Sequence, residues 1–414
     1  MKKFEQLEQQ EKVVITDREK EAKKNSKTTI SPLLLGIGAG VIVLIIIGIV
    51  FLLFGNRMQP APVPPSYPST NSAPTDHTGV QESKGKNGEK IWTIGKVSYS
   101  LKDGEMEVNG SGTIKEVEKT ISSDDYYSIH SVIINRGITK IESRAFEDCT
   151  TLEKVSIPET VTEIEYNAFS GCFSLEEVSI EEGLERIGDN VFTDCKKLRQ
   201  IVLPDSLKTM GHKTFYNCSN LTEAVLPQNL EIIEDYTFYN CLKLRNILIP
   251  SGLIKLGNEV FLGCSSLTSV TLPDGIKSVG YGVFHGCSKL ASINWPVSIK
   301  NIGERMFSGC TSLEDVTIPN GITAIGPQAF AGCTGLEEIV IPEGVVDIGD
   351  CAFLNCSNLT KVSLPSSIET IGSFALNQVD SLKTINYAGT KEQWKNISIA
   401  PNAISTRATV SFDS

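Results

Sequence analysis

The sequence predicts a solenoid of about eleven stacked coils, preceded by a small β-rich cap and by a single transmembrane helix. Two observations carry this prediction. Residues 141–164 read IESRAFEDCTTLEKVSIPETVTEI, and residues 164–187 repeat the pattern as IEYNAFSGCFSLEEVSIEEGLERI, 23 residues later. Residues 33–54 form an uncharged apolar run, LLLGIGAGVIVLIIIGIVFLLF.

The repeat is anchored by phenylalanine, which recurs at an unvarying spacing of 23 residues. Each Phe is followed by Cys three residues later and by Leu six residues later, and Leu376 takes the eleventh Phe position. A coil of this size cannot bury its apolar side alone, so successive coils must stack. We therefore expect a buried core position, where replacement by Ala costs about 3–5 kcal/mol. The ten residues are Phe146, Phe169, Phe192, Phe215, Phe238, Phe261, Phe284, Phe307, Phe330 and Phe353.

The segment nine to eleven residues after each Phe alternates as Val-x-Ile, which predicts one short strand per coil. Each strand should pair in parallel with the strand of the next coil, about 4.8 Å away. The following Pro has no N–H and ends the ladder. In most coils a Gly follows an apolar residue, usually Ile, at the same repeat position. Glu142, Glu165 and Glu234 occupy that position in the other coils. A positive φ is therefore not expected there, and the preference for Gly has no explanation in the sequence.

Ten of the eleven Cys occupy one repeat position. A zinc site needs about four ligands that converge on one point, which a line of thiols cannot supply. Disulfides between neighbouring coils remain an alternative, but parallel side chains place Cβ atoms about 4.8 Å apart, beyond the usual range. We expect buried, reduced thiols. Cys351 lies off this line at a position that looks solvent-facing, so it is either the most reactive thiol or an inert surface residue.

The apolar run is long enough to cross a bilayer of about 30 Å. A buried core helix or a cleaved signal peptide would also be apolar, but about 30 polar residues precede the run and no cleavage site follows. Residues 1–30 carry eight Lys or Arg, whereas Arg57 stands alone until Lys84. The N-terminus should therefore be cytoplasmic and the rest outside the cell. Gly36 and Gly40 have the spacing of a weak self-association motif.

Composition and pattern changes divide the chain into six parts. The N-terminal cap contains a hairpin about Asp103 and Gly104, and the C-terminal cap contains a short helix with Thr390 and Gln393 at capping-box spacing and a last strand over 407–412. The parts are a cytoplasmic tail (1–30), a transmembrane helix (31–55), a Pro/Ser-rich stalk and linker (56–90), a β-rich N-terminal cap (91–137), the solenoid (138–386) and a C-terminal cap (387–414).

The chemistry available to the chain is limited. The formal net charge of -11 argues against a nucleic-acid partner, because phosphates attract clustered Lys and Arg. No Ser/His/Asp constellation, phosphate-binding loop or metal cluster stands out, and His212 and His285 fall at different repeat positions without an evident partner. We expect neither an enzyme nor a cofactor.

Two groups of residues beside the predicted strands are candidates for ligand binding. Val202, Val225 and Leu248 would form three successive exposed aliphatic residues, which mark a contact site or reflect β-propensity alone. Asp315 and Glu338 would stack on adjacent coils, where like charges repel. A basic partner or a cation would relieve that repulsion, unless the two form an ordinary solvated surface.

The phrase IGxxAFxxCxxLxxVxIP, present most fully as IGPQAFAGCTGLEEIVIP at 325–342, resembles the repeats of bacterial BspA-like leucine-rich repeat surface proteins, the Treponema pallidum type. The resemblance covers about 138–386, with mild departures such as Trp295 in place of Ile. It implies an α/β-type leucine-rich repeat horseshoe with its strands on the concave side. It also implies a surface protein, in some members linked to adhesion to matrix proteins or cells, and no catalytic residues.

Two functional hypotheses follow. In the first, the chain is anchored in the cell membrane and binds a protein or cell-surface partner through the solenoid face. In the alternative, it is a cell-envelope scaffold or sensor that couples the external repeats to the cytoplasmic tail. The tail is short and lacks a recognisable signalling motif, which favours the first hypothesis.

Overall fold

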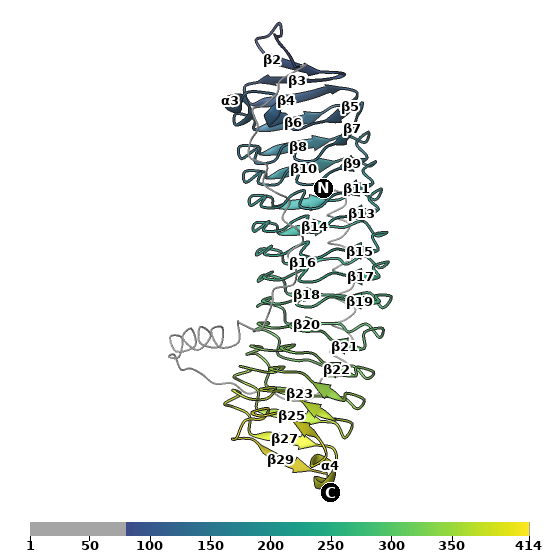
Figure 1. The fold of residues 1–414 in the computed structure, drawn as a ribbon, viewed down its shortest axis with the longest axis vertical. Helices are drawn as coiled ribbons and strands as arrows, with labels where there is room; N and C mark the ends of the chain where they lie inside the picture. Colours follow the sequence, from purple (N-terminus) through teal and green to yellow (C-terminus); the bar gives the residue numbers. More distant parts are fainter. Residues whose placement is uncertain (1–79, 414) are drawn as a thin grey trace, which may run out of the picture. The chain divides into compact units, whose positions relative to one another are not determined.

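The computed structural model describes residues 80–413. The predicted tail, transmembrane helix and most of the stalk, with Gly36 and Gly40, lie outside the described residues. Within 80–413, the structure has no helix with the length and apolar character needed to cross a membrane. The described part consists of about 13 turns of about 23 residues each, stacked one upon another (Figure 1).

The stack begins with an antiparallel cap made of β1 (Gln81–Lys84), β2 (Lys90–Ile94), β3 (Val97–Lys102) and β4 (Glu105–Gly110). The linker expected over 56–90 is therefore too long, because residues 81–84 pair with β2. The predicted hairpin joins β3 to β4, and Asp103 and Gly104 have φ values of 48° and 82°. Two successive positive φ values match the right-handed twist of a two-residue hairpin.

Beyond the cap, each coil except that of Phe307 contributes a strand to a first face, where the Val-x-Ile segments lie; the Phe307 coil has only an isolated bridge from Thr317 to Val340. Pairing is parallel and shifts by 23 residues, as in Val155 opposite Val178, and the cap strand β4 pairs in parallel with the first of these strands. The first-face strands are β6 (Ser131–Ile134), β8 (Lys154–Ile157), β10 (Glu177–Ile180), β12 (Gln200–Val202), β14 (Glu223–Val225), β16 (Asn246–Ile247), β18 (Ser269–Val270), β20 (Ser292–Ile293), β23 (Glu338–Val340), β25 (Lys361–Leu364) and β27 (Thr384–Tyr387).

Each coil also contributes a second strand, which the sequence analysis missed. These segments are mostly two residues long, too short to show an alternating pattern, yet they pair in parallel across a second face. The second-face strands are β5 (Gly112–Ile114), β7 (Ile138–Ile141), β9 (Glu163–Ile164), β11 (Arg186–Ile187), β13 (Thr209–Met210), β15 (Ile232–Ile233), β17 (Lys255–Leu256), β19 (Ser278–Val279), β21 (Asn301–Ile302), β22 (Ala324–Ile325), β24 (Asp347–Ile348), β26 (Thr370–Ile371) and β28 (Ser398–Ile399).

A tight turn around each Phe closes the coil on a third side, here called the turn face. Main-chain hydrogen bonds join successive turns, as from Phe146 N to Ala168 O at 2.8 Å. The residue two positions before each Phe has a left-handed backbone, with φ near 60° at Arg144 and Tyr236. Such a conformation costs roughly 1–3 kcal/mol for a residue other than Gly, so stacking of the turns must offset it.

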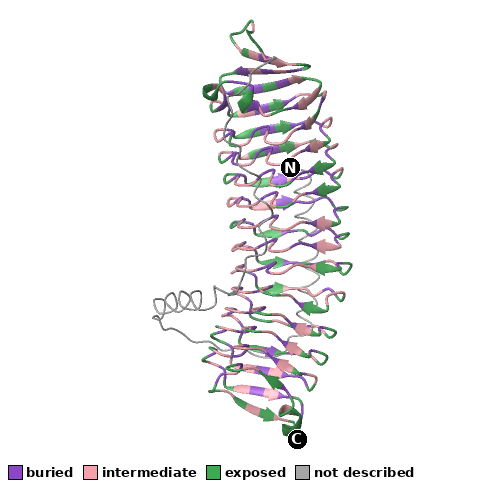
Figure 2. Cartoon of the chain, in the orientation of Figure 1, coloured by how far each residue is buried: buried purple, intermediate pink, exposed green. Residues whose placement is uncertain are grey.

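The core is a continuous column shared by all coils, and Figure 2 shows buried residues recurring in each one. The ten Phe residues that recur every 23 positions are fully buried, as is Leu376 at the eleventh position. Neighbouring rings stack nearly parallel, as for Phe215 and Phe238 with centroids 5.5 Å apart. The apolar column explains why one repeat cannot fold without its neighbours.

The structure explains the recurrent Gly of the second face. At Gly211 and Gly257 a Cβ would lie 2.6 Å from the main-chain nitrogen of the preceding coil, and neither residue has a positive φ. Gly is therefore preferred because successive coils approach closely at this corner, and the backbone conformation itself does not require it.

Both ends are covered. In the N-terminal cap, η1 (Val117–Lys119) and α3 (Ser123–Tyr126) lead into the first coil. At the C-terminus, α4 (Lys391–Trp394) begins with the predicted capping box of Thr390 and Gln393. The last strand, β29 (Thr409–Phe412), pairs with β27. Phe412 of this strand and Trp394 of α4 pack edge-on against each other, which shields the final coil.

Candidate binding surfaces

The first face carries the aliphatic row of Val202, Val225 and Leu248, and the structure corrects the expectation that all three are exposed. Val202 is half-buried, Val225 is only 8% exposed, and Leu248 is 48% exposed. A side chain in this row is flanked by those of the coils above and below, which take surface from a small residue between them. The row therefore presents one well-exposed aliphatic residue instead of a continuous patch of three.

The acidic pair on the same face is exposed, as expected for Asp315 and Glu338. The chain supplies its own cation to one of them, because Lys361 Nζ lies 3.2 Å from Glu338 Oε2. A similar cross-strand pair joins Lys154 to Glu177 at 3.5 Å. No bound cation is needed to offset the repulsion at Glu338, and exposed pairs of this kind contribute at most about 1 kcal/mol.

The ten Cys of the repeat are buried free thiols. Nine of them donate a hydrogen bond to the carbonyl of the Phe one coil earlier, as from Cys264 Sγ to Phe238 O at 3.1 Å, and Cys149 donates to Tyr126 O. Burial raises the pKa of these thiols, to about 12 at Cys149 and Cys356. The line of thiols therefore fills space and holds adjacent turns together.

Cys351 is half-buried, not exposed as the sequence analysis expected. It occupies the left-handed turn position, with a φ of 58°. Burial raises the pKa of its thiol, and the nearby Asp350 carboxylate raises it further. Reactive thiols have depressed pKa values, so Cys351 is accessible in part but is not activated.

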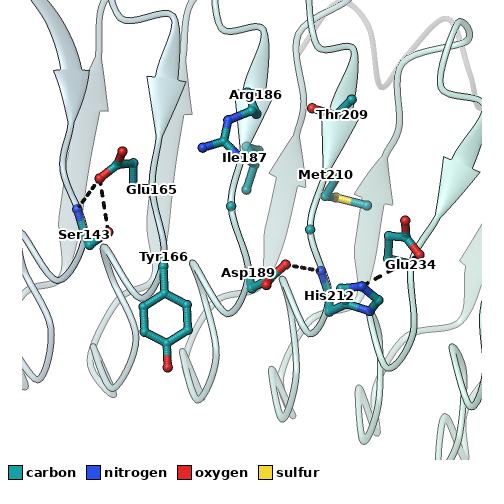
Figure 3. A pocket seen from close by; sticks show the side chains of 12 residues that line it. Ser143, Glu165, Tyr166, Arg186, Ile187, Asp189, Thr209, Met210, His212 and Glu234 are labelled. Carbon is teal, nitrogen blue, oxygen red and sulfur yellow. Dashed lines mark hydrogen bonds and ion pairs between the residues drawn. The ribbon is translucent and has the colours of Figure 1, made fainter. Parts of the chain in front are cut away.

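A shallow groove crosses the corner between the second face and the turn face, and the sequence analysis did not find it. The buried side chains of Ile187 and Met210 line its base, together with Gly188 and Gly211. Its remaining lining is mostly polar, as Figure 3 shows, and comprises Ser143, Glu165, Tyr166, Arg186, Asp189, Thr209, His212 and Glu234.

His212 is the most distinctive residue of the groove, and it does have partners. Its main-chain N–H donates to Asp189 Oδ1 at 2.8 Å, and its Nε2 atom lies 4.0 Å from Glu234 Oε2 (Figure 3). The signal in the sequence was the repeat itself, because these residues lie 23 and 22 positions from His212 and therefore on adjacent coils.

Three donor groups come together here, since His212, Glu234 and Asp235 place ligand atoms within 4.8 Å of one another. Both carboxylates already have partners. Lys255 Nζ lies 3.0 Å from Glu234 Oε2, and Asn258 donates its main-chain N–H to Asp235 Oδ1 at 2.8 Å. A metal ion would have to displace the lysine, so the arrangement is better suited to hydrogen bonding with a polar partner.

The turn face carries a group of tyrosines that sequence reasoning also missed. The rings of Tyr216 and Tyr239 stack at 4.6 Å, and Tyr236 donates to or accepts from the Tyr281 hydroxyl at 3.2 Å. Lys213 Nζ lies 5.7 and 5.4 Å from the ring centres of Tyr216 and Tyr236. Tyrosine is enriched in protein interfaces because its ring is apolar and its hydroxyl forms hydrogen bonds.

Comparison with known proteins identifies the class. Residues 119–245, 231–356 and 300–404 match the BspA type leucine-rich repeat region. These overlapping matches span most of the chain, which therefore belongs to the BspA type leucine-rich repeat family. The match indicates no enzyme family, and repeat proteins of this kind act as binding scaffolds. No curated protein matches the chain.

Three solved structures of bacterial proteins are similar to this chain. The pneumococcal vaccine antigen PcpA is 18% identical, with a TM-score of 0.50, over 78% of this chain and 98% of that one. A leucine-rich repeat protein from Bacteroides ovatus is 24% identical, with a TM-score of 0.49, over 78% of this chain and 99% of that one. A leucine rich cell surface protein from Faecalibacterium prausnitzii is 23% identical, with a TM-score of 0.40, over 74% and 97% of the two chains.

Proposed function

We propose that the protein is a membrane-anchored, cell-surface binding protein whose solenoid faces outward and contacts a protein or cell-surface partner. One observation carries the proposal. The inward positions are nearly invariant from coil to coil, whereas the outward positions differ, as in Ser179, Val202 and Leu248 at one repeat position of three coils. Stacked coils thus present an extended, non-repeating surface, which suits a large partner better than a small molecule.

The surface chemistry supports a macromolecular partner. The groove is shallow and polar, and most of its charges are already paired within the chain, as Arg186 is with Glu163. Small-molecule sites are usually deeper and mainly apolar. We infer that contact spreads over several coils, with Leu248 as one exposed aliphatic residue of the first face.

The location outside the cell is part of the proposal and is supported by the uncharged run at 33–54 and the Lys/Arg bias of residues 1–30. The proposed horseshoe, with the first-face strands on its concave side, rests on the family resemblance. Protease added to intact cells should remove the repeats and leave a short protected N-terminal fragment. Repeats that stay intact until the cells are lysed would contradict the outside location.

The binding proposal is tested by capture experiments with residues 80–414 against extracellular matrix proteins and neighbouring cells. Leu248 on the first face and Leu242 near the turn face are a matched pair, with exposed fractions of 48% and 45%. If the first face binds, Leu248→Glu should weaken capture by at least about tenfold, because truncating or charging an interface anchor costs more than about 1.4 kcal/mol. Leu242→Glu should leave capture unchanged. The reverse result would move the site to the turn face, and no capture at all would reject the proposal.

A further inference from the structure

The stacking of the coils is interrupted at one position. We call residues 275–297 the Phe284 coil and residues 298–320 the Phe307 coil, and the contact between them the break. Within residues 80–413, no strand pairing joins β19 to β21 across the break on the second face, and β20 has no paired strand after it on the first face. The sheets are also interrupted elsewhere, but only at the break do both faces lose their pairing between the same two coils.

Comparison with the equivalent positions of neighbouring coils shows which hydrogen bonds are missing at the break. One coil earlier, Lys277 N donates to Ile254 O at 2.8 Å, and one coil later Thr323 N donates to Lys300 O at 2.7 Å. The equivalent bond from Lys300 N to the Lys277 carbonyl is absent from the described structure. The same holds for Gly303, whereas the main-chain N–H of Gly280 bonds to Leu256 O at 2.8 Å.

Side chains near the break show the same separation. Ser206 Oγ and Ser367 Oγ each donate at 2.8 Å to a carbonyl of the preceding coil. Ser298 occupies their repeat position, but its Oγ is buried without a hydrogen-bond partner. An unpaired buried hydroxyl costs roughly 1–3 kcal/mol, which is consistent with coils that have moved apart at this point.

The core is also opened there. Val270, Leu272 and Ile276 are buried, but the residues 23 positions later, Ile293, Trp295 and Ile299, are only partly buried. Two further partly buried core residues, Val279 and Val316, lie on the two sides of the break. Apart from Ile180, the other core residues that are only partly buried lie in the terminal caps.

The sequence supplies a cause. Trp295 occupies the position that Leu272 holds one coil earlier, and its indole packs edge-on against Phe307 at 5.5 Å. The large ring holds the following coil away. Toward the preceding coil, the side chain of Asn294 replaces a main-chain hydrogen bond. It accepts from Leu272 N at 2.7 Å and donates to Leu272 O at 2.9 Å. In a regular coil the main chain makes such a bond, as from Leu203 N to Val225 O.

The turn face, by contrast, continues across the break. Phe284 N donates to Met306 O at 3.0 Å, Cys310 Sγ donates to Phe284 O at 3.1 Å, and the rings of Phe284 and Phe307 stack at 5.6 Å. Two sides of the coil are therefore open while the third stays joined.

We infer that the solenoid has a hinge at the break, with the Phe284–Phe307 turn as its axis and the two sheet faces as its opening edges. The two arms are residues 80–297 and 298–413. A hinge of this kind follows from the one-dimensional energetics of a repeat array, in which each interface contributes separately. A weak interface opens locally while the arms stay folded. Hinge opening would let the first-face surfaces of the two arms change their relative angle.

Two lysines at equivalent positions of neighbouring coils allow the hinge to be tested within one chain. Lys277 and Lys300 are exposed and occupy the same repeat position, but only the Lys277 amide is hydrogen-bonded to the preceding coil. In hydrogen exchange of the intact chain, amides at 299–303 should exchange at least about tenfold faster than those at 276–280. In limited trypsin digestion, cleavage after Lys300 should precede cleavage after Lys277. Equal rates in either measurement would overturn the inference.

Variants identify the cause. Trp295→Leu restores the residue that the preceding coil carries, and it should slow both exchange at 299–303 and cleavage after Lys300 by severalfold. The matched change Leu272→Trp should open the interface one coil earlier and raise exchange of the amides at 276–280. If Trp295→Leu leaves both rates unchanged while the wild-type chain shows the fast exchange, the assignment of the hinge to the tryptophan is wrong.

Discussion

Replacing Phe238 by Ala tests whether the stacked Phe column carries the stability of the array. Phe238 is fully buried in the middle of the column, and its ring lies 5.5 Å from that of Phe215 and 5.7 Å from that of Phe261. Burial of a Phe removes roughly 150–250 Å² from water, and at about 25 cal/mol per Å² this corresponds to about 4–6 kcal/mol. Measured Phe-to-Ala changes in cores cost about 3–5 kcal/mol, which is the loss we expect.

Phe238→Leu is the matched control, because Leu376 already occupies the same repeat position and is fully buried. We expect it to cost less than about 1.5 kcal/mol, since it leaves a smaller cavity. Urea denaturation followed by circular dichroism measures both values. Hydrogen exchange should place the loss in the coils next to Phe238 and spare distant coils such as that of Phe353. A cost below about 1 kcal/mol for Phe238→Ala, or equal costs for both variants, would refute the reasoning.

The remaining predictions concern titration and backbone conformation. A thiol reagent should modify at most Cys351 in the native chain and all eleven Cys after denaturation, because ten are buried free thiols. Stability should fall steeply above about pH 9, because the buried thiols keep their protons in the folded state while unfolded thiols ionise at their ordinary pKa of about 8.5. Cys351→Gly should stabilise the chain by about 1 kcal/mol, because Gly relieves the positive φ of 58°. Glu259→Gln should stabilise it near neutral pH, since burial raises the pKa of Glu259 in the folded state, and this gain should vanish below the pKa of an unfolded Glu, where the wild-type carboxyl is also neutral.

Each of these four predictions has a result that would contradict it. Fewer than about eight reactive thiols after denaturation without reductant would indicate disulfides between coils. A flat stability profile between pH 8 and 10 would show that the thiols ionise as easily in the folded chain as in the unfolded one. Loss of stability in Cys351→Gly would mean that the half-buried thiol contributes more than its backbone conformation costs. A gain in Glu259→Gln that persists at low pH would point to a cause other than ionisation.

The sequence predicted the structure well at the repeat positions that face the core. The spacing of Phe, Cys and Leu identified the buried column, the Val-x-Ile alternation located the first-face strands, and their parallel register follows from equal coil lengths. The hairpin turn at Asp103 and the helix cap at Thr390 were also predicted correctly. These features depend on residues that are close in the chain or separated by whole repeats, so their pattern is visible in one dimension.

The candidate surfaces were predicted less well. Exposure of Val225 was overestimated, because an alternating pattern shows which side a residue faces but not how much its neighbours on adjacent coils cover it. The groove around His212 was missed, because its lining comes from several coils and from two faces that meet at a corner. The tyrosines of the turn face were missed for the same reason.

By itself, the sequence determined that identical coils stack around a shared apolar column, because each coil has an apolar side it cannot bury alone. Only the tertiary structure decided how closely each pair of coils approaches. It brought successive second-face segments within pairing distance, required Gly where a Cβ would meet the neighbouring main chain, and left the coils of Phe284 and Phe307 apart beside Trp295. The physical reason is that these outcomes depend on the volume that packed side chains occupy between coils, which a repeat pattern does not encode.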